Sequence, residues 1–243
     1  MTTGDGSNDD LKRAMVVTAH PDDAEYGCSG SVAKWCRLGW EVVYVLCTDG
    51  SKGTEDRDTT SEQLAELRAE EQIKAGKTLG LKTVEFLGYP DGYLEPTLEL
   101  RRDISRQIRV RKPDVLITVN PTRDLMSSGY IGHPDHFAAG EATLSAVFPS
   151  ARDHLTFPEL FYDEGLEPHK VREVWVMSFG ADANFWNPLT EADVDLSIKA
   201  LHDHVSQVSN PEEAAKWMKS RRAETGQKIG ADYAEGFRKF TLS

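Results

Sequence analysis

The sequence predicts an α/β fold, because three observations agree. Short apolar runs alternate along the chain with segments whose apolar residues recur at helical spacing. The runs are rich in valine and show little polar alternation, as expected for strands of a parallel sheet that is covered on both faces. Gly39, Gly80 and Pro113 fall where helices should turn back into strands. We therefore expect a parallel-rich sheet with helices on both faces and right-handed crossovers.

Each element can be assigned to a segment. Strands are expected at residues 15–18, 41–48, 83–87, 115–119 and 174–179. Helices are expected at residues 30–38, 61–79, 98–111, 135–147, 191–208 and 211–229. The helix over 191–208 carries a narrow apolar stripe, formed by Val194, Ile198, Leu201, Val205 and Val208. No repeat or low-complexity linker divides residues 13–243, so we expect one Rossmann-like domain behind a disordered, Gly/Asp/Ser/Asn-rich leader over residues 1–12.

The composition argues against several classes of partner. Lys and Arg total 28 against 40 Asp and Glu, and the resulting net charge of −12 disfavours nucleic acid. No apolar stretch approaches the roughly 20 residues that a membrane helix needs, and the N-terminus does not resemble a signal peptide. Cys28, Cys36 and Cys47 form no CxxC pair, so we expect small buried side chains in a reducing cytoplasm. A small molecule is the expected binding partner.

Polar clusters follow four of the expected strands. In open parallel sheets, ligands bind beyond the carboxyl ends of the strands, at a switch point in strand order. The clusters in chain order are His20–Asp23, Asp49–Ser51, Tyr89–Gly92 and Asn120–Pro121, with His133–His136 beyond the last. We therefore expect the active site at this edge of the sheet. A dinucleotide is disfavoured, because the first turn lacks GxGxxG and holds carboxylates where a pyrophosphate would sit.

Two His-Pro-Asp blocks predict the chemistry. They are His20-Pro21-Asp22-Asp23 and His133-Pro134-Asp135-His136, and each places two coordinating groups at i and i+3. Two imidazoles and one carboxylate are the ligand set of a hydrolytic zinc site, in which the fourth position is left for water. His20, Asp23 and His136 are thus the expected ligands of Zn²⁺. Such a site also permits other divalent ions, such as Fe²⁺ or Co²⁺.

Asp22 and His133 remain for proton transfer. Asp22 cannot point the same way as Asp23 without strong like-charge repulsion, and a base aimed at the metal-bound water resolves that conflict. His133 lies one helical turn before His136, where it can stabilise the oxyanion and protonate the leaving nitrogen. A lone His-Pro or Asp-Asp pair is usually only a turn signal. Two such blocks at the strand ends of one sheet favour a metal-dependent hydrolase.

Other polar residues have a structural interpretation. Glu25 can simply charge the start of the helix that follows it. His154 and His169 lie in a Pro-rich, irregular stretch and are expected at the surface. His202 and His204 flank the apolar stripe of the 191–208 helix at about 80° on either side, counting 100° per residue. Histidines at such a boundary are usually structural.

The two blocks also carry a family resemblance. His20–Glu25 and Gly132–His136 resemble the signature motifs of the PIG-L/LmbE-like zinc deacetylases. That family includes the GlcNAc-inositol deacetylases of mycothiol and bacillithiol synthesis, chitobiose deacetylases and related amidases. The resemblance extends from Ala14 to Arg238, and its further segments are Thr48–Gly50, Arg68 with Glu70–Glu71, Phe86–Gly92, His204–Gln207 and Tyr233–Arg238.

The resemblance implies roles for individual residues. His20, Asp23 and His136 would be the zinc ligands, Asp22 the general base and His133 its acidic partner. It further implies that Arg68 and Asp91 touch the sugar-like part of the substrate and that His204 is a pocket residue. A family tyrosine two positions before His133 is replaced by Ile131, with Tyr130 one position earlier. A homo-oligomer is also implied, for which exposed apolar residues are expected at Phe185, Trp186, Trp217, Phe237 and Phe240.

Three functions remain open at this point. The first is hydrolysis of an N-acyl group, above all acetyl, from an amino sugar or related glycoside. The second is an amidase that acts on thiol conjugates or other non-sugar N-acyl compounds. The third is a non-catalytic protein that binds a small molecule, which the complete set of ligands and acid/base groups disfavours. The loops expected to select the acyl acceptor are residues 49–61, 120–132 and 150–170, which have no readable pattern.

Overall fold

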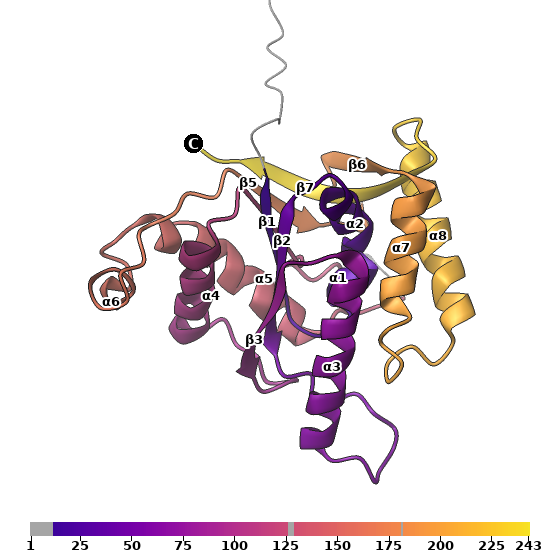
Figure 1. The fold of residues 1–243 in the computed structure, drawn as a ribbon, viewed down its shortest axis with the longest axis horizontal. Helices are drawn as coiled ribbons and strands as arrows, with labels where there is room; N and C mark the ends of the chain where they lie inside the picture. Colours follow the sequence, from indigo (N-terminus) through magenta and orange to yellow (C-terminus); the bar gives the residue numbers. More distant parts are fainter. Residues whose placement is uncertain (1–11, 126–128, 181) are drawn as a thin grey trace, which may run out of the picture.

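The computed structural model describes residues 12–125, 129–180 and 182–243 (Figure 1). The leader predicted over residues 1–12 lies outside the described residues, apart from Lys12. Within them, seven strands form one sheet in the order β3-β2-β1-β4-β5-β7-β6. The parallel strands are β1 (Arg13–Thr18), β2 (Glu41–Thr48), β3 (Thr83–Tyr89), β4 (Val115–Thr118) and β5 (Glu173–Met177). The antiparallel strands are β6 (Phe185–Leu189) and β7 (Tyr233–Thr241).

Helices cover both faces of this sheet, which confirms the predicted fold class. One face carries α4 (Leu98–Arg111) and α5 (Pro134–Val147). The other carries α1 (Asp23–Gly27), α2 (Ser29–Arg37), α3 (Ser61–Leu79), α7 (Glu191–Leu201) and α8 (Pro211–Gln227) (Figure 1). The short α6 (Pro158–Tyr162) lies in an arm that projects beyond α4. β1, β2 and β4 are buried on both sides, because each strand is covered above and below.

Most predicted elements end within two residues of their observed bounds, and α3 shows why. Its first turn is closed by a capping box, in which Thr60 and Gln63 each accept a hydrogen bond from the other's backbone N–H. Its last turn ends at Gly80, which has a left-handed backbone (φ 85°) that suits glycine. Both signals are readable in the sequence, so the bounds 61–79 are predicted correctly.

The predicted helix over 191–208 is wrong in its second half. α7 ends at Leu201, and the chain then makes a tight turn in which the His204 N–H donates to the Leu201 carbonyl (3.0 Å). Leu201 and Val208 still pack together with Met218 in a small apolar cluster. Val205, however, is 71% exposed. The apolar spacing therefore reflects packing of Leu201 and Val208 into one cluster, and not a continuous helix.

The sequence also misses α1, α6, β6 and β7. β7 mixes charged and apolar residues, and β6 carries Pro188, which is tolerated because β6 is an edge strand. The insertion of β7 between β5 and β6 buries Phe237 completely against Trp175, so the predicted exposure of Phe237 is wrong. Phe185 and Trp186 are half-buried, whereas Trp217 and Phe240 are exposed.

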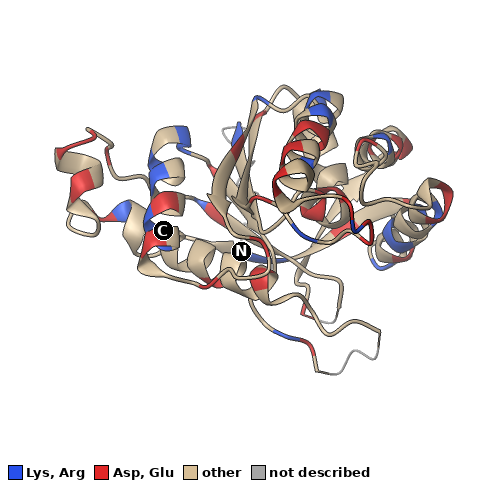
Figure 2. Cartoon of the chain, turned by 90° about the horizontal axis from the view of Figure 1, so that it is seen from below, with Lys and Arg blue, Asp and Glu red and all other residues tan. Residues whose placement is uncertain are grey.

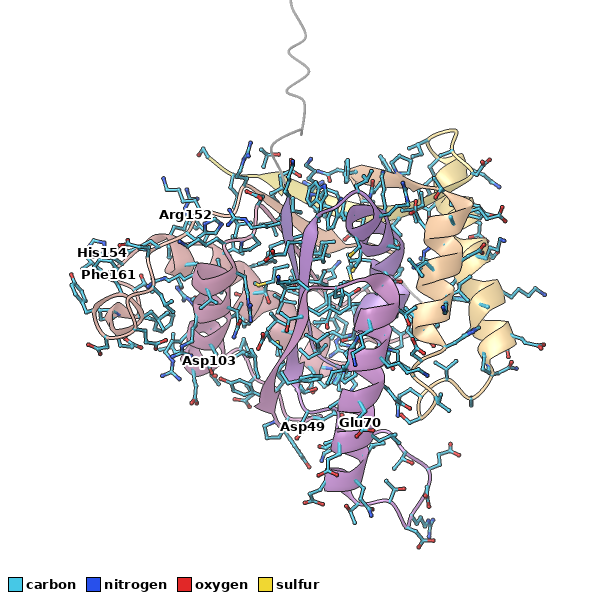
Figure 3. All side chains as sticks on the ribbon, in the orientation of Figure 1. Asp49, Glu70, Asp103, Arg152, His154 and Phe161 are labelled. Carbon is cyan, nitrogen blue, oxygen red and sulfur yellow. The ribbon has the colours of Figure 1, made fainter. Side chains whose placement is uncertain are left out.

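The remaining surface features separate into confirmed and corrected predictions. His154 is exposed on the projecting arm, where its ring contacts Phe161 (Figure 3). His169 is half-buried instead, and its Nε2 lies 2.7 Å from the Pro113 carbonyl. Cys28 and Cys47 are buried, and Cys36 is half-buried. Figure 2 shows acidic and basic residues interleaved along the outer helices. Among the described residues, none of the helices is long and apolar enough to cross a membrane.

Candidate active site

The candidate site lies at the carboxyl ends of the parallel strands. His20 follows β1, Asp91 follows β3, and His133 begins α5 in the segment after β4. Asp49, which follows β2 at the same edge (Figure 3), accepts a hydrogen bond from the Asp91 N–H (3.2 Å) and so ties the loops after β2 and β3 together. The topology brings residues that are more than 100 positions apart to one edge, as the clusters at the strand ends predict.

His20, Asp23 and His136 come together as one group. The His136 Nε2 lies 2.9 Å from the Asp23 Oδ1, and the His20 Nδ1 lies 3.6 Å from the Asp23 Oδ2. One ligand atom from each of the three residues lies within 4.8 Å of the others, a spacing that a single metal ion can bridge. Asp23 is held in place because its Oδ2 also accepts hydrogen bonds from the N–H groups of Ala19 (3.1 Å) and His20 (2.9 Å).

The other ring nitrogen of His20 faces two more carboxylates. Its Nε2 lies 3.0 Å from the Asp91 Oδ1 and 3.2 Å from the Asp135 Oδ2. Burial would lower the pKa of His20, but the carboxylates of Asp135, Asp23 and Asp91 raise it to about 12. Metal-binding histidines usually donate their second N–H to a carboxylate in this way, which fixes the ring. His20 is therefore oriented to offer its Nδ1 to a metal.

The charges around His20 fit a divalent cation. The carboxylates of Asp23, Asp91 and Asp135 lie within 3.6 Å of its ring nitrogens, and the guanidinium of Arg68 lies 3.7 Å from Asp22 and 3.8 Å from Asp91. Burying several carboxylates together is costly unless a cation or hydrogen bonds offset their charge. Imidazole nitrogens beside carboxylate oxygens are donors that suit zinc and related ions. The donor set therefore fits the metal that the sequence predicts.

Asp135 is a member of the site that sequence reasoning did not single out. It is fully buried at the start of α5, and it accepts hydrogen bonds from the N–H groups of Gly92 (2.8 Å) and Leu94 (3.2 Å). It thereby joins α5 to the loop after β3 and supports His20 from behind. Its place inside the second His-Pro-Asp block is the signal that could have identified it.

Asp22 precedes Asp23 and has an unusual backbone conformation. Its φ of 90° is left-handed, which is uncommon outside glycine, and its carboxylate lies 3.7 Å from the Arg68 guanidinium. Gln72 fixes this turn, because its Oε1 accepts the Asp22 N–H (3.1 Å). Burial, followed by the negative charge of Asp23, raises the pKa of Asp22 to about 7. A carboxylate with such a pKa suits a general base at neutral pH.

Arg68 and Asp91 are both buried and engaged with the protein. Arg68 donates to the carbonyls of Pro21 (2.8 Å), Gly50 (3.1 Å) and Lys52 (3.1 Å), so it joins the loops after β1 and β2. Asp91 accepts the Lys52 N–H (3.0 Å) and faces His20. These contacts position the metal group. Contact of Arg68 and Asp91 with a sugar remains a prediction.

His133 is the more open of the two proton-transfer candidates. It is the N-cap of α5, and its Nδ1 accepts the Asp135 N–H (3.2 Å), so the neutral ring carries its proton on Nε2. Burial, followed by the positive charge of His20, lowers the pKa of His133. The neighbouring Tyr130 is exposed, and its hydroxyl accepts the His133 N–H (3.1 Å). Tyr130 therefore lies beside the site, although it is one position away from the family tyrosine.

His204 lies in the turn after α7 and is fully buried. Its Nε2 is 3.5 Å from the Glu25 Oε2, and the Glu25 Oε1 accepts a hydrogen bond from the Gln72 Nε2 (3.2 Å). Burial would lower the pKa of His204, but Glu25 raises it. Glu25 is also buried, so it does more than charge the first turn of α1. Contact of His204 with a substrate remains a prediction.

The geometry agrees with comparisons to known proteins. A family model described as PIG-L: GlcNAc-PI de-N-acetylase matches residues 15–147. A diacetylchitobiose deacetylase of Thermococcus kodakarensis is 30% identical over 233 residues, which cover 94% of this chain and 83% of the relative. The chain belongs to the PIG-L family. Deacetylases of this family depend on a metal, and the group of His20, Asp23 and His136 lies within the matched segment.

Further relatives of this PIG-L protein support its fold and reaction class. A solved structure of N,N'-diacetylchitobiose deacetylase from Pyrococcus horikoshii matches with a TM-score of 0.86 at 28% identity, covering 96% of this chain and 85% of that one. A mycothiol S-conjugate amidase of Streptomyces coelicolor is 29% identical over 184 residues, 67% of this chain and 60% of the relative. Deacetylases and amidases both cleave amide C–N bonds, and this PIG-L chain is a hydrolase of that class.

Proposed function

We propose that the protein is a zinc-dependent deacetylase, which removes an N-acetyl group from an amino sugar or a related glycoside. The observation that carries the proposal is the convergence of His20, Asp23 and His136, with the left-handed backbone of Asp22 directly before Asp23. The relatives support the substrate class, because those named diacetylchitobiose deacetylase match the chain over almost its whole length.

His20, Asp23 and His136 are the residues that would hold the metal. When bound, Zn²⁺ supplies a Lewis acid that acidifies water and polarises the amide carbonyl. Asp91 and Asp135 hold the His20 ring by its Nε2, and backbone N–H groups hold Asp23, so the three side chains are positioned in advance. Such preorganisation reduces the rearrangement that metal binding requires.

Asp22 is proposed to transfer the proton, and His133 to stabilise the oxyanion. Asp22, with its raised pKa, accepts a proton from the attacking water at its carboxylate oxygen. The Nε2–H of neutral His133 donates a hydrogen bond to the oxyanion as the tetrahedral intermediate forms. Collapse of the intermediate breaks the C–N bond, and the proton collected by Asp22 reaches the leaving nitrogen to give the free amine. Acetate is the second product.

An amidase that acts on thiol conjugates is the second candidate. The similarity to a mycothiol S-conjugate amidase favours it, although the match covers a smaller part of both proteins than the match to the deacetylase. The same groups would cleave either amide, so the catalytic residues do not separate the two. Selection must come from the residues that surround the part of the substrate beyond the amide.

A release assay for free amine tests the proposal. The zinc-loaded protein is offered N-acetyl sugars, mycothiol-type conjugates and N-acyl amino acids. We expect release from the N-acetyl sugars, with kcat/KM at least about tenfold above that for the thiol conjugates, a difference of about 1.4 kcal/mol in transition-state binding. The reverse order would favour the amidase. Release from none of them by a metal-loaded protein would contradict both.

Assembly and location are further parts of the proposal. We propose a homo-oligomer, and the edge strand β6 with the half-buried Phe185 and Trp186 offers a surface for it. The free cysteines, of which Cys28 and Cys47 are buried, support a reducing cytoplasm. Multi-angle light scattering at micromolar concentration should give a multiple of the 27.1 kDa chain mass. A strict monomer would contradict the assembly.

A further inference from the structure

A second pocket lies at the same edge of the sheet, away from the metal group. It is a shallow, open depression between α1, α8 and the end of β5; its interior volume is about 30 Å³, so a ligand would lie against its open sides. Tyr26, Phe179, Trp217 and Arg221 form its sides. Of these, only Tyr26 lies inside the segment matched by the family model, so most of the pocket comes from the part of the chain that the model does not cover.

The sides of the pocket are aromatic faces with a guanidinium between them. Trp217 and Arg221 are four residues apart, on one face of α8. The Arg221 guanidinium lies 5.2 Å from the Phe179 ring and 5.7 Å from the Trp217 ring, and the Tyr26 ring meets Trp217 edge-on at 5.9 Å. Phe179 is 57% exposed and Trp217 44%, so large parts of both rings face solvent.

The floor of the pocket is rigid and polar. Arg222 and Glu235 form a buried ion pair there, with the Arg222 Nη2 2.7 Å from the Glu235 Oε1. Glu235 also accepts hydrogen bonds from the N–H groups of Gly30 (2.9 Å) and Ser31 (2.7 Å). These charges are satisfied within the protein. The floor therefore provides a fixed base. The Arg221 Nη2 donates to the Phe179 carbonyl (3.0 Å), and its other N–H groups and the aromatic sides are left to select a ligand.

The pocket is adjacent to the proposed general base. The Tyr26 N–H donates to the Asp22 carbonyl (3.2 Å). Because four residues of an α-helix rise by about 6 Å, the backbones of Asp22 and Tyr26 lie about one helical turn apart. Ser178 and Phe179 follow β5, two strands along the sheet from β1.

We propose that this pocket is a subsite for the sugar ring attached to the N-acetyl sugar that is being deacetylated. The C–H faces of a pyranose ring pack against aromatic rings, and its hydroxyl groups accept hydrogen bonds from a guanidinium. A pocket of exposed aromatic faces with one cationic donor offers both contacts. The proposal rests on the deacetylase function. It deepens that function by assigning preference for a disaccharide over a monosaccharide to Trp217 and Arg221.

The test compares two substrates and two matched variants. kcat/KM is measured for diacetylchitobiose and for N-acetylglucosamine in the wild type, in Trp217→Ala and in Phe240→Ala. Phe240 is a suitable control, because it is also an exposed aromatic residue beside an arginine (Arg238, 5.8 Å). Phe240 pairs with Val174 at the start of β5, so it lies at the opposite edge of the sheet. Trp217→Phe tests whether an aromatic face alone restores the preference.

We expect the ratio of the two kcat/KM values, disaccharide over monosaccharide, to fall about tenfold in Trp217→Ala. It should stay within about twofold of wild type in Phe240→Ala, and Trp217→Phe should recover most of it. An unchanged ratio in Trp217→Ala, or an equal loss on both substrates, would overturn the proposal. So would light scattering in which Trp217→Ala separates an oligomer, because a second copy of the chain would then cover the pocket.

A binding measurement distinguishes failure of the subsite from failure of the proposed function. The deacetylated disaccharide is titrated into the zinc-loaded wild type and the same variants by calorimetry. We expect Kd to rise about tenfold in Trp217→Ala and to stay unchanged in Phe240→Ala. If the wild type hydrolyses neither sugar and still shows this pattern, the function fails and the subsite stands. Equal Kd values in Trp217→Ala and the wild type would overturn the subsite.

Discussion

Buried charges are arranged differently in the C-terminal part of the sheet and at the strand ends around His20. In the C-terminal part, the carboxylate of Glu235 meets Arg222 at 2.7 Å and accepts two backbone N–H groups, so its charge is matched within the protein. At the strand ends, the carboxylates of Asp23, Asp91 and Asp135 gather around His20, and Arg68 lies 3.7 Å from Asp22 and 3.8 Å from Asp91. The first arrangement is complete without a ligand. The second has donor groups that a bound cation would join.

This difference separates the parts of the molecule that support the fold from the part that performs chemistry. A matched buried ion pair is strongly destabilising to break, because one charge is then left unpaired in the interior. Crowded carboxylates instead repel one another until a metal joins them. The strand ends should therefore respond to metal and the C-terminal part should not. The predictions below test that separation.

Removal of the metal should have the largest effect on activity. Chelation should abolish amine release, and Zn²⁺ should restore it, because the proposed reaction needs the Lewis acid. Zinc at 100 times its Kd should also stabilise the folded state by about 2.7 kcal/mol, seen as a rise in the melting temperature. Asp23→Ala is the control, since it should show neither response. A chelated protein with full activity would contradict the comparison.

Breaking the matched pair should have the largest effect on stability. Arg222→Met leaves Glu235 buried without its cation, so unfolding in urea should show a loss of about 3–5 kcal/mol. The control is Arg106→Met, which breaks a more exposed pair with Glu164 (2.8 Å) and should cost less than about 1 kcal/mol. The zinc content of the folded fraction should be unchanged in both variants. Equal losses in the two would remove the distinction between the regions.

His133→Ala should reduce turnover and leave the metal in place. The ring lies outside the predicted ligand group, and its proposed contribution is a hydrogen bond to the oxyanion. Loss of one such donor costs about 10²–10³ in kcat. Zinc content by atomic absorption should match wild type. Loss of the metal from this variant would instead assign His133 to the ligand set, together with His20 and Asp135, which also lie close enough to hold an ion.

The smallest effect concerns a matched carboxylate far from the metal. Asp193 pairs with Arg37 (3.0 Å) and completes the capping box of α7. Burial alone would raise the pKa of Asp193, but the hydrogen bonds from Arg37 and Thr190 lower that pKa overall. A lowered pKa stabilises the fold above the unfolded value of about 3.9 and loses that effect as the pH falls through the folded value. Asp193→Asn should therefore cost about 1 kcal/mol at pH 7 and less at pH 3. A cost that grows on acidification would contradict this sign.

The sequence predicts which residues come together at the strand ends, because its signals there are local. His20-Pro21-Asp22-Asp23 directly follows a buried strand, and the parallel topology then determines where it meets His136. The supporting contacts are not local. Gln72 reaches Asp22 from the middle of α3, and Asp135 joins His20 only after α5 has packed. Nothing in the spacing of those residues indicates their partners.

The C-terminal part is predicted less well for a physical reason. β7 places charged residues beside apolar ones, since Glu235 points to Arg222 while Phe237 enters the core. The turn after Leu201 is likewise set by tertiary packing, which buries His204 and leaves Val205 exposed. Hydrophobic periodicity predicts a polar segment or a longer helix in such places, because contacts with distant elements determine the structure that forms there.

The most direct test of the account compares Asp22→Asn with Asp23→Ala, by measuring zinc content and kcat in each. If Asp22 is the base and Asp23 a ligand, Asp22→Asn should retain near-stoichiometric zinc while kcat falls by about 10²–10⁴, because an amide cannot accept the proton. Asp23→Ala should lose the metal and the activity together. Zinc loss in Asp22→Asn as complete as in Asp23→Ala would show that ligand and base have been exchanged. Near-normal turnover in Asp22→Asn would contradict the mechanism.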